Sequence, residues 1–266
     1  MDPHAPFSRD RRKRLHARAQ ASFAAADFLH RAMAEETRAR IEALGRNFPR
    51  VLDLGGPAPA WPGATRLSLS PEAGPTIIGE EDRLPFAEAS FDLIISIAGL
   101  ASLSDLPGAL VQARRALAPD GLFAACIAGG LTLGELREDL ILAESTLLGR
   151  AAARIAPMVE AQAAAGLLSR AGFVMPVADS ERLSVRYPSL DRLLADLTAM
   201  GARSPLAHVS PLRRDVLNDV RRRFAARAES DGKTAVTIDL VHMAGWAPGS
   251  APGLDSELAR AITRAI

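Results

Sequence analysis

The stretch Val51-Leu52-Asp53-Leu54-Gly55-Gly56, followed by Pro57-Ala58-Pro59, says most about how this chain folds. A short apolar run that ends in an acid, a leucine and two glycines is typical of a β-strand that leads into a ligand-binding turn. Glycine lets the backbone approach a ligand because it lacks a Cβ and accepts positive φ angles. The two prolines stand where further small residues would be expected, so the sequence predicts a stiff, altered binding loop.

After this stretch, short apolar runs typical of strands are followed by a segment with helical periodicity and then by another apolar run. An alternation of this kind predicts a mostly parallel sheet with right-handed crossovers. A ligand would then lie at the carboxyl ends of the strands. The expected strands are 50–54, 65–69, 76–79, 91–97 and 122–128, with a helix over 106–117 that ends at the turn Pro119-Asp120-Gly121.

Longer helical patterns lie before the first strand and in the second half of the chain. Residues 11–45 show helical periodicity, and 1–48 are predicted to form an N-terminal helical extension. A single α/β domain is expected over 49–248, with helical insertions between about 131 and 230, and a tail over 249–266. The expected later elements are helices 132–148, 157–171, 190–200 and 211–228, strands 173–178, 183–187 and 234–243, and a short terminal helix 255–266.

The composition limits the functional classes. The 266 residues are 48% hydrophobic and carry a formal net charge of +1, which gives no reason to expect a nucleic-acid partner. The single cysteine, Cys126, suits a reducing compartment and is expected to be a buried apolar residue. No run reaches the ~20 apolar residues of a membrane span, and no signal peptide is indicated. We therefore expect a cytoplasmic protein, and the scarcity of lysine suggests a GC-rich bacterial source.

Three segments resemble the class I S-adenosylmethionine-dependent methyltransferases. The resemblance implies an α/β Rossmann-like fold with a mostly parallel seven-stranded sheet and helical insertions. It also implies S-adenosylmethionine as the cofactor. The segments are 51–56, the run from Asp82 to Ser96 with its Leu-Pro-Phe and Ser-Phe-Asp motifs, and the run from Arg115 to Gly121.

A longer set of segments resembles the methyltransferase-like assembly factors of respiratory complex I. In mitochondria that family is associated with hydroxylation of an arginine on a complex I subunit. This resemblance implies a protein subunit of a respiratory complex, or a small-molecule acceptor, as partner, and a location at the periphery of the inner membrane. A more distant resemblance is to the malonyl-carrier-protein methyltransferases of biotin synthesis. The segments are 7–14, 105–110, 129–137, 143–144, 167–176, 185–187 and 245–248.

The resemblance assigns six residues to the cofactor site. Asp53 with the two glycines would order the loop and the methionine end, Ser68 stands where an acid usually grips the ribose, Glu80 would meet the adenine, and Ser96 would flank the methyl-transfer pocket. Each lost charged hydrogen bond costs ~1.5–3 kcal/mol, so the altered loop and the missing acid would weaken binding by roughly two to four orders of magnitude. The assigned residues are Asp53, Gly55, Gly56, Ser68, Glu80 and Ser96.

Simpler interpretations of these residues stay open. Asp53 could cap the loop without touching a ligand, and Glu80, Glu81 and Asp82 could form a solvated turn. The five histidines do not have metal-ligand spacing, so no metal is expected, and the sequence identifies no catalytic residue. Three functions stay open: an S-adenosylmethionine-dependent enzyme that acts on a protein or a small acceptor, a methyltransferase-like factor related to complex I assembly with a degenerate cofactor loop, and an inactive scaffold that binds other proteins.

Overall fold

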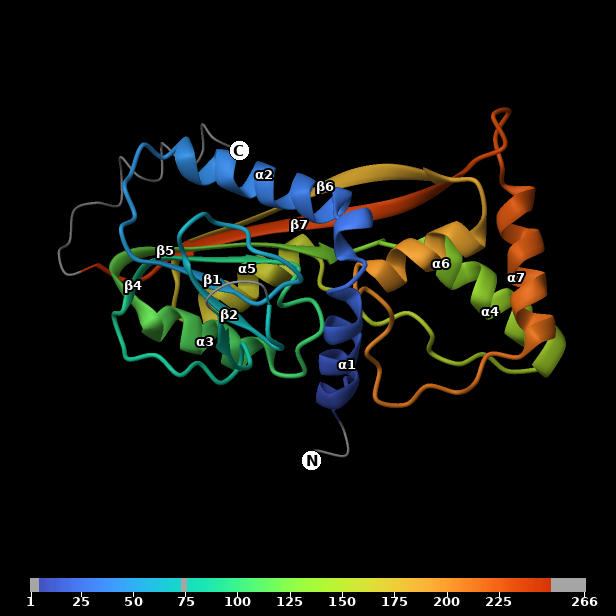
Figure 1. Ribbon diagram of the computed structural model, residues 1–266, viewed down its shortest axis with the longest axis horizontal. Helices are drawn as coiled ribbons and strands as arrows, with labels where there is room; N and C mark the ends of the chain where they lie inside the picture. Colours follow the sequence, from blue (N-terminus) through green and yellow to red (C-terminus); the bar gives the residue numbers. More distant parts are fainter. Residues whose placement is uncertain (1–4, 73–75, 250–266) are drawn as a thin grey trace.

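The computed structural model describes residues 5–72 and 76–249 and has one seven-stranded sheet at its centre (Figure 1). The strand order β3-β2-β1-β4-β5-β7-β6 confirms the predicted α/β class, and neighbouring strands from β3 to β5 pair in parallel. Only β7 runs antiparallel to both of its neighbours. The strands are β1 (Val51–Leu54), β2 (Thr65–Ser68), β3 (Ile77–Ile78), β4 (Phe91–Ile97), β5 (Leu117–Gly129), β6 (Val174–Tyr187) and β7 (Thr234–Trp246).

Helices cover both faces of this sheet. Because side chains alternate along a strand, Leu93 and Ile95 of β4 belong to one apolar cluster and Ile94 belongs to the other. Helix α2 packs on the first face, and α3 and α5 pack on the second. The helices are α1 (Arg9–Ala19), α2 (Phe28–Glu42), α3 (Leu106–Ala116), α4 (Gly134–Leu148), α5 (Ala161–Arg170), α6 (Leu190–Ala199) and α7 (Arg214–Ala226).

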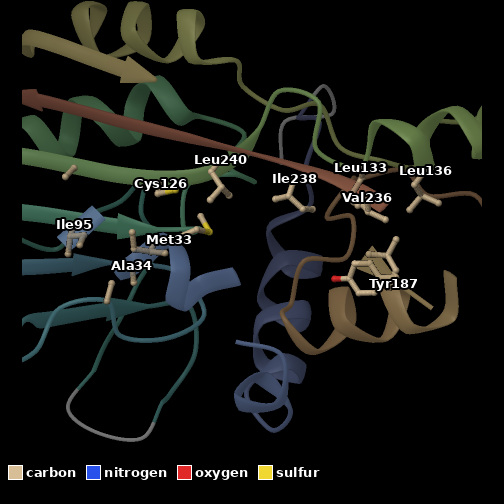
Figure 2. Packing of buried hydrophobic residues seen from close by; sticks show 14 of the residues in the cluster. Met33, Ala34, Ile95, Cys126, Leu133, Leu136, Tyr187, Val236, Ile238 and Leu240 are labelled. Atoms are coloured by element: carbon tan, nitrogen blue, oxygen red, sulfur yellow. The ribbon is translucent and has the colours of Figure 1, made fainter. Parts of the chain in front are cut away.

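The first apolar cluster extends beyond the centre of the sheet. Figure 2 shows it continuing along β7 from Leu240 through Ile238 to Val236. There it meets α4, α6 and α7, which gather at the far end of β6 and β7 in Figure 1. The late helices are therefore additions around one sheet, in the place where the sequence predicts helical insertions.

Three predicted elements were wrong in detail. The helix expected over 11–45 is broken into α1 and α2 by a turn that buries Phe23 in the short 3-10 helix Phe23–Ala25. The chain turns there because α1 lies across the strand ends whereas α2 lies along the sheet. The turn triplet at Pro119 lies inside β5 as an irregularity, with Asp120 at φ 59°. The strands expected at 173–178 and 183–187 form one strand, β6, because it pairs with β7 along its length.

Other predictions are confirmed or lie outside the described region. Strand β4 has the predicted bounds, and Cys126 is fully buried in β5. Burial raises the pKa of its thiol, so it is an inert core residue. The helix expected over 255–266 lies outside the described residues.

Candidate functional site

The loop after β1 needs glycine at two successive positions. Gly55 and Gly56 have φ angles of 68° and 83°, a region that residues with a Cβ rarely adopt. A Cβ on Gly56 would overlap the carbonyl oxygen of Ile97, at the end of the neighbouring strand β4. The sharp turn at the carboxyl end of β1 is therefore fixed by backbone packing against β4.

Asp53 orders this loop from beneath. Its carboxylate is fully buried and accepts hydrogen bonds from the Ala60 amide at 2.5 Å and from Arg66 Nη1 at 2.9 Å. Burial raises the pKa of Asp53, while Arg66 and the loop amides act in the opposite direction. Asp53 therefore joins β1 to the loop, which is the simpler of its two predicted roles.

Arg66 of β2 is a site residue that the sequence analysis missed. Its side chain is buried, and its guanidinium donates to the carbonyl oxygens of Gly55 and, at 2.8 Å, Gly56. It also pairs with Glu72 through two N–H groups at 3.0 and 3.1 Å. Arg66 lies opposite Asp53 in the pairing of β1 with β2. Spacing along the sequence does not predict this contact, because it depends on the register of the two strands.

Glu72 supplies the carboxylate that the sequence appeared to lack after β2. It lies four residues beyond Ser68, and its side chain is buried. The Ser68 hydroxyl donates to Glu72 Oε1. Ser68 itself is fully buried. The acid at the end of β2 is thus present, but it already has Arg66 and Ser68 as partners.

Helix α1 lies across the carboxyl ends of the strands. Arg12 donates two hydrogen bonds to the fully buried carboxylate of Glu81, at 2.8 and 2.5 Å, and one to the Gly99 carbonyl oxygen at 2.7 Å. The Glu81 carboxylate fills the space that a Cβ on Gly55 would occupy. One turn further along α1, His16 Nε2 lies 3.0 Å from the Gly56 carbonyl oxygen. The space beside Gly55 is therefore filled by the protein itself.

The remaining two predicted site residues lie apart from this cluster. Glu80 pairs with Lys13 at 2.5 Å and with Arg9, both on α1. Burial acts to raise the pKa of Glu80, but these two cations outweigh it and the pKa is lowered. Ser96 is fully buried and donates its hydroxyl to the Leu54 carbonyl oxygen at 2.6 Å, which ties β4 to β1.

A cavity of about 210 Å³ lies beside the glycine turn, beneath α1. Of the six residues predicted to bind the cofactor, Gly56 is the one that lines it. Its walls are mainly apolar and come from α1, α2, α6 and the ends of β1, β4 and β5. The residues that line the cavity include Met33, Met158, Met200, Arg12, Arg203 and Ala156.

The described residues include neither a metal-binding cluster nor a membrane-spanning helix. Within 5–72 and 76–249, no three His, Cys, Asp or Glu side chains are grouped so that they could hold a metal ion. In the same ranges no helix has the length and hydropathy needed to cross a membrane.

Comparison with known sequences gives consistent matches. Residues 65–125 match the family described as a methyltransferase domain, a segment that begins after the glycine turn. The chain is 32% identical over 248 residues to the mitochondrial arginine-hydroxylase NDUFAF5 of Homo sapiens, covering 83% of this chain and 70% of that protein. For Danio rerio NDUFAF5 the identity is 35% over 180 residues, or 54% of that protein. The malonyl-[acyl-carrier protein] O-methyltransferase of Xylella fastidiosa is 31% identical over 244 residues, with 80% and 79% covered.

Solved structures share the fold. An S-adenosylmethionine-dependent methyltransferase from Thermotoga maritima superimposes with a TM-score of 0.51 at 15% identity, covering 88% of this chain and 99% of that one. The YcgJ protein of Bacillus subtilis gives a TM-score of 0.50, also at 15% identity, covering 79% and 100%. At this identity the likeness establishes the architecture.

Proposed function

We propose that this chain, which belongs to the methyltransferase-domain family that includes the mitochondrial arginine-hydroxylase NDUFAF5, binds S-adenosylmethionine weakly at the ends of β1 and β4. The observation that carries the proposal is the position of the glycine turn. In the order β3-β2-β1-β4-β5, the crossovers change direction between β1 and β4. Ligands of open α/β sheets bind at this switch point, and the Gly55-Gly56 turn lies there.

As arranged here, the residues do not fit the cofactor. Asp53 and Glu72 are paired with Arg66, Glu80 is paired with α1, and the Glu81 carboxylate fills the hollow beside Gly55. The cavity of 210 Å³ is also smaller than the ~300–1,000 Å³ of ordinary small-molecule sites. Binding therefore requires these internal contacts to open, and that cost lowers the affinity.

Titration calorimetry of the full chain with S-adenosylmethionine tests this function. We expect a saturable heat with a Kd between about 10 μM and 1 mM, the latter equivalent to about −4 kcal/mol. Asp53→Asn should abolish the heat because it removes the carboxylate that, once released from Arg66, would hold the methionine end of the ligand. The matched control is Asp92→Asn, which loses a carboxylate paired with Arg50 at the opposite end of the sheet. If the unmodified protein gives no saturable heat, or if both variants behave alike, the proposal is wrong.

A scaffold function is the second candidate, and the arginine side chains that occupy the site favour it. Arg66 and Arg12 bind the carboxylates and carbonyl oxygens that a cofactor would use. A protein that retained the fold only to bind a partner would be stabilised by such pairs. In that case Asp53→Asn lowers the stability while S-adenosylmethionine leaves the melting temperature of every variant unchanged.

For the cellular role we infer an association with a respiratory complex. Support comes from the identity to arginine-hydroxylase NDUFAF5 and from the sequence resemblance to complex I assembly factors. The partner would be a protein subunit met at the periphery of the inner membrane, with a small-molecule acceptor as the other option. The chain spans 54 to 70% of the length of those relatives. Any activity of the full-length relatives is therefore only proposed for this chain.

Deletion of the gene tests the cellular role. We expect loss of assembled complex I and of NADH oxidation, restored by the unmodified gene. Unchanged assembly in the deletion strain would discard the role. A gene carrying Asp53→Ala distinguishes the two functions, because the scaffold candidate predicts full restoration if the variant accumulates normally.

A further inference from the structure

We propose that the cavity beneath α1 binds a medium-chain alkyl carboxylate, with the chain in the cavity and the carboxylate at Arg203. This inference names a ligand class for the site in the proposed function, but its test needs no S-adenosylmethionine. Three observations carry it: the size and apolarity of the cavity, the kind of charge on its walls, and the state of Arg203.

The size and walls of the cavity suit an alkyl chain. An apolar cavity of about 150 Å³ is known to bind benzene, and this one measures about 210 Å³. Three methionines line it: Met33 from α2, Met158 from the segment before α5, and Met200 after α6. Methionine side chains are flexible and polarizable, so they adapt to chains of differing shape.

The charge on the walls favours an anionic head group. Among the described residues no Asp or Glu side chain lines the cavity, and the permanently charged residues that line it are Arg12 and Arg203. A cationic ligand would find no partner there, whereas an anion would find a positive rim.

Arg203 is the group that remains available. The charge of Arg12 is already offset by Glu81 at 2.5 Å. Arg203 is exposed, and among residues 5–72 and 76–249 it has no hydrogen-bond or ion-pair partner. It therefore lies where a buried chain would emerge into solvent, and a guanidinium is well suited to bind a carboxylate through two N–H groups.

The test uses methyl NMR of the full chain labelled at its methionine methyl groups, titrated with sodium octanoate. The signals of Met33, Met158 and Met200 should shift in a saturable way. Those of Met175 and Met243, which do not line this cavity, should stay unchanged and serve as internal controls. Acetate, which has the head group alone, should shift none of them.

Two variants test the two halves of the proposal. Arg203→Gln should weaken octanoate binding two- to fivefold, the range expected of an exposed ion pair, and leave the binding of the uncharged probe 1-octanol unchanged. Ala156→Phe, which adds bulk to the cavity wall, should abolish the shifts produced by both probes. Its folding is checked by the unchanged signals of Met175 and Met243.

Three results would overturn the proposal. Octanoate could leave the cavity methionines unshifted, it could shift all the methionines equally as a detergent would, or it could bind Arg203→Gln as tightly as the unmodified protein. None of these depends on S-adenosylmethionine binding. Failure of the ligand class and failure of the proposed function are therefore separate outcomes.

Discussion

At the scale of single residues, the glycine turn is a position where an added side chain should lower the free energy of unfolding. Gly56→Ala would place a Cβ against the Ile97 carbonyl oxygen at a φ of 83°. Gly45 offers a matched control, because it has a φ of 63° but nothing within 4 Å of its added Cβ. We expect Gly45→Ala to cost about 1–2 kcal/mol from the dihedral angle alone. Gly56→Ala should cost at least about 2 kcal/mol more, since backbone cannot move aside. Urea unfolding measures both, and equal costs would contradict the packing described here.

His30 is a second residue whose environment has a measurable consequence. It is buried, its ring meets Phe23 edge-on at 5.5 Å between centroids, and its Nε2 has no partner among the described residues. Burial, followed by the nearby charge of Arg66, lowers the pKa of His30 from 6.5 to about 4.

That shift predicts a loss of stability in mild acid. Above pH 6.5 the histidine is neutral in both the folded and the unfolded chain, so it contributes nothing. Between pH 6.5 and 4 the unfolded chain binds the proton first, and the free energy of unfolding falls by about 3 kcal/mol in total. His30→Leu should remove this part of the pH dependence, whereas the same change at the exposed His208 should not. Identical pH profiles for the two variants would refute the assignment.

At the scale of elements, α1 is held on the strand ends by ion pairs that differ in burial. Arg12 and Glu81 are 12% and 0% exposed, and Lys13 and Glu80 are 46% and 16% exposed. A partly solvated pair contributes about 0–1 kcal/mol. Loss of one partner of a buried pair costs about 3–5 kcal/mol, because the other charge is left uncompensated.

We therefore expect Arg12→Gln to destabilise the protein by about 3–5 kcal/mol and Lys13→Gln by less than about 1 kcal/mol. The double variant Arg12→Gln, Glu81→Gln should recover most of the loss, since no buried charge remains. Urea unfolding gives the energies, and hydrogen exchange of the α1 amides shows whether the helix is released. Similar costs for Arg12→Gln and Lys13→Gln would argue against a buried attachment of α1.

At the scale of the whole molecule, the N-terminal segment divides into a removable and an essential part. Helix α2 buries Met33, Ala34 and Ile41 against the sheet, and each large side chain contributes about 1.5–3 kcal/mol. The loss of Met33 and Ile41 together, about 3–6 kcal/mol, reaches the lower end of the net stability of a domain, about 5–15 kcal/mol. Helix α2 therefore belongs to the same apolar core as the sheet.

Truncation tests this division. A chain that lacks residues 1–20 should still unfold cooperatively, because α1 contributes mainly polar contacts. A chain that lacks residues 1–48 should be insoluble or lose its cooperative transition. Circular dichroism during thermal unfolding measures both, and cooperative unfolding of the shorter chain would show that α2 is dispensable.

The sequence predicted elements wherever local pattern alone decides the structure. The continuous apolar run of β4 has the bounds expected of a strand buried on both faces, and the glycine turn lies at the end of β1. The break between α1 and α2 was not predictable in this way. Helical periodicity continues through it, and it exists because two parts of the sheet offer separate surfaces.

The sequence by itself determined the parallel α/β class, the family resemblance and the glycine turn, because each is visible in short motifs along the chain. Only the tertiary structure decided how the site is filled. Arg12, Glu81 and the Arg66–Glu72 pair come from three separate segments, and nothing in their spacing predicts that they meet. Buried charges must find partners wherever the fold brings them together. At the ends of these strands they pair with one another.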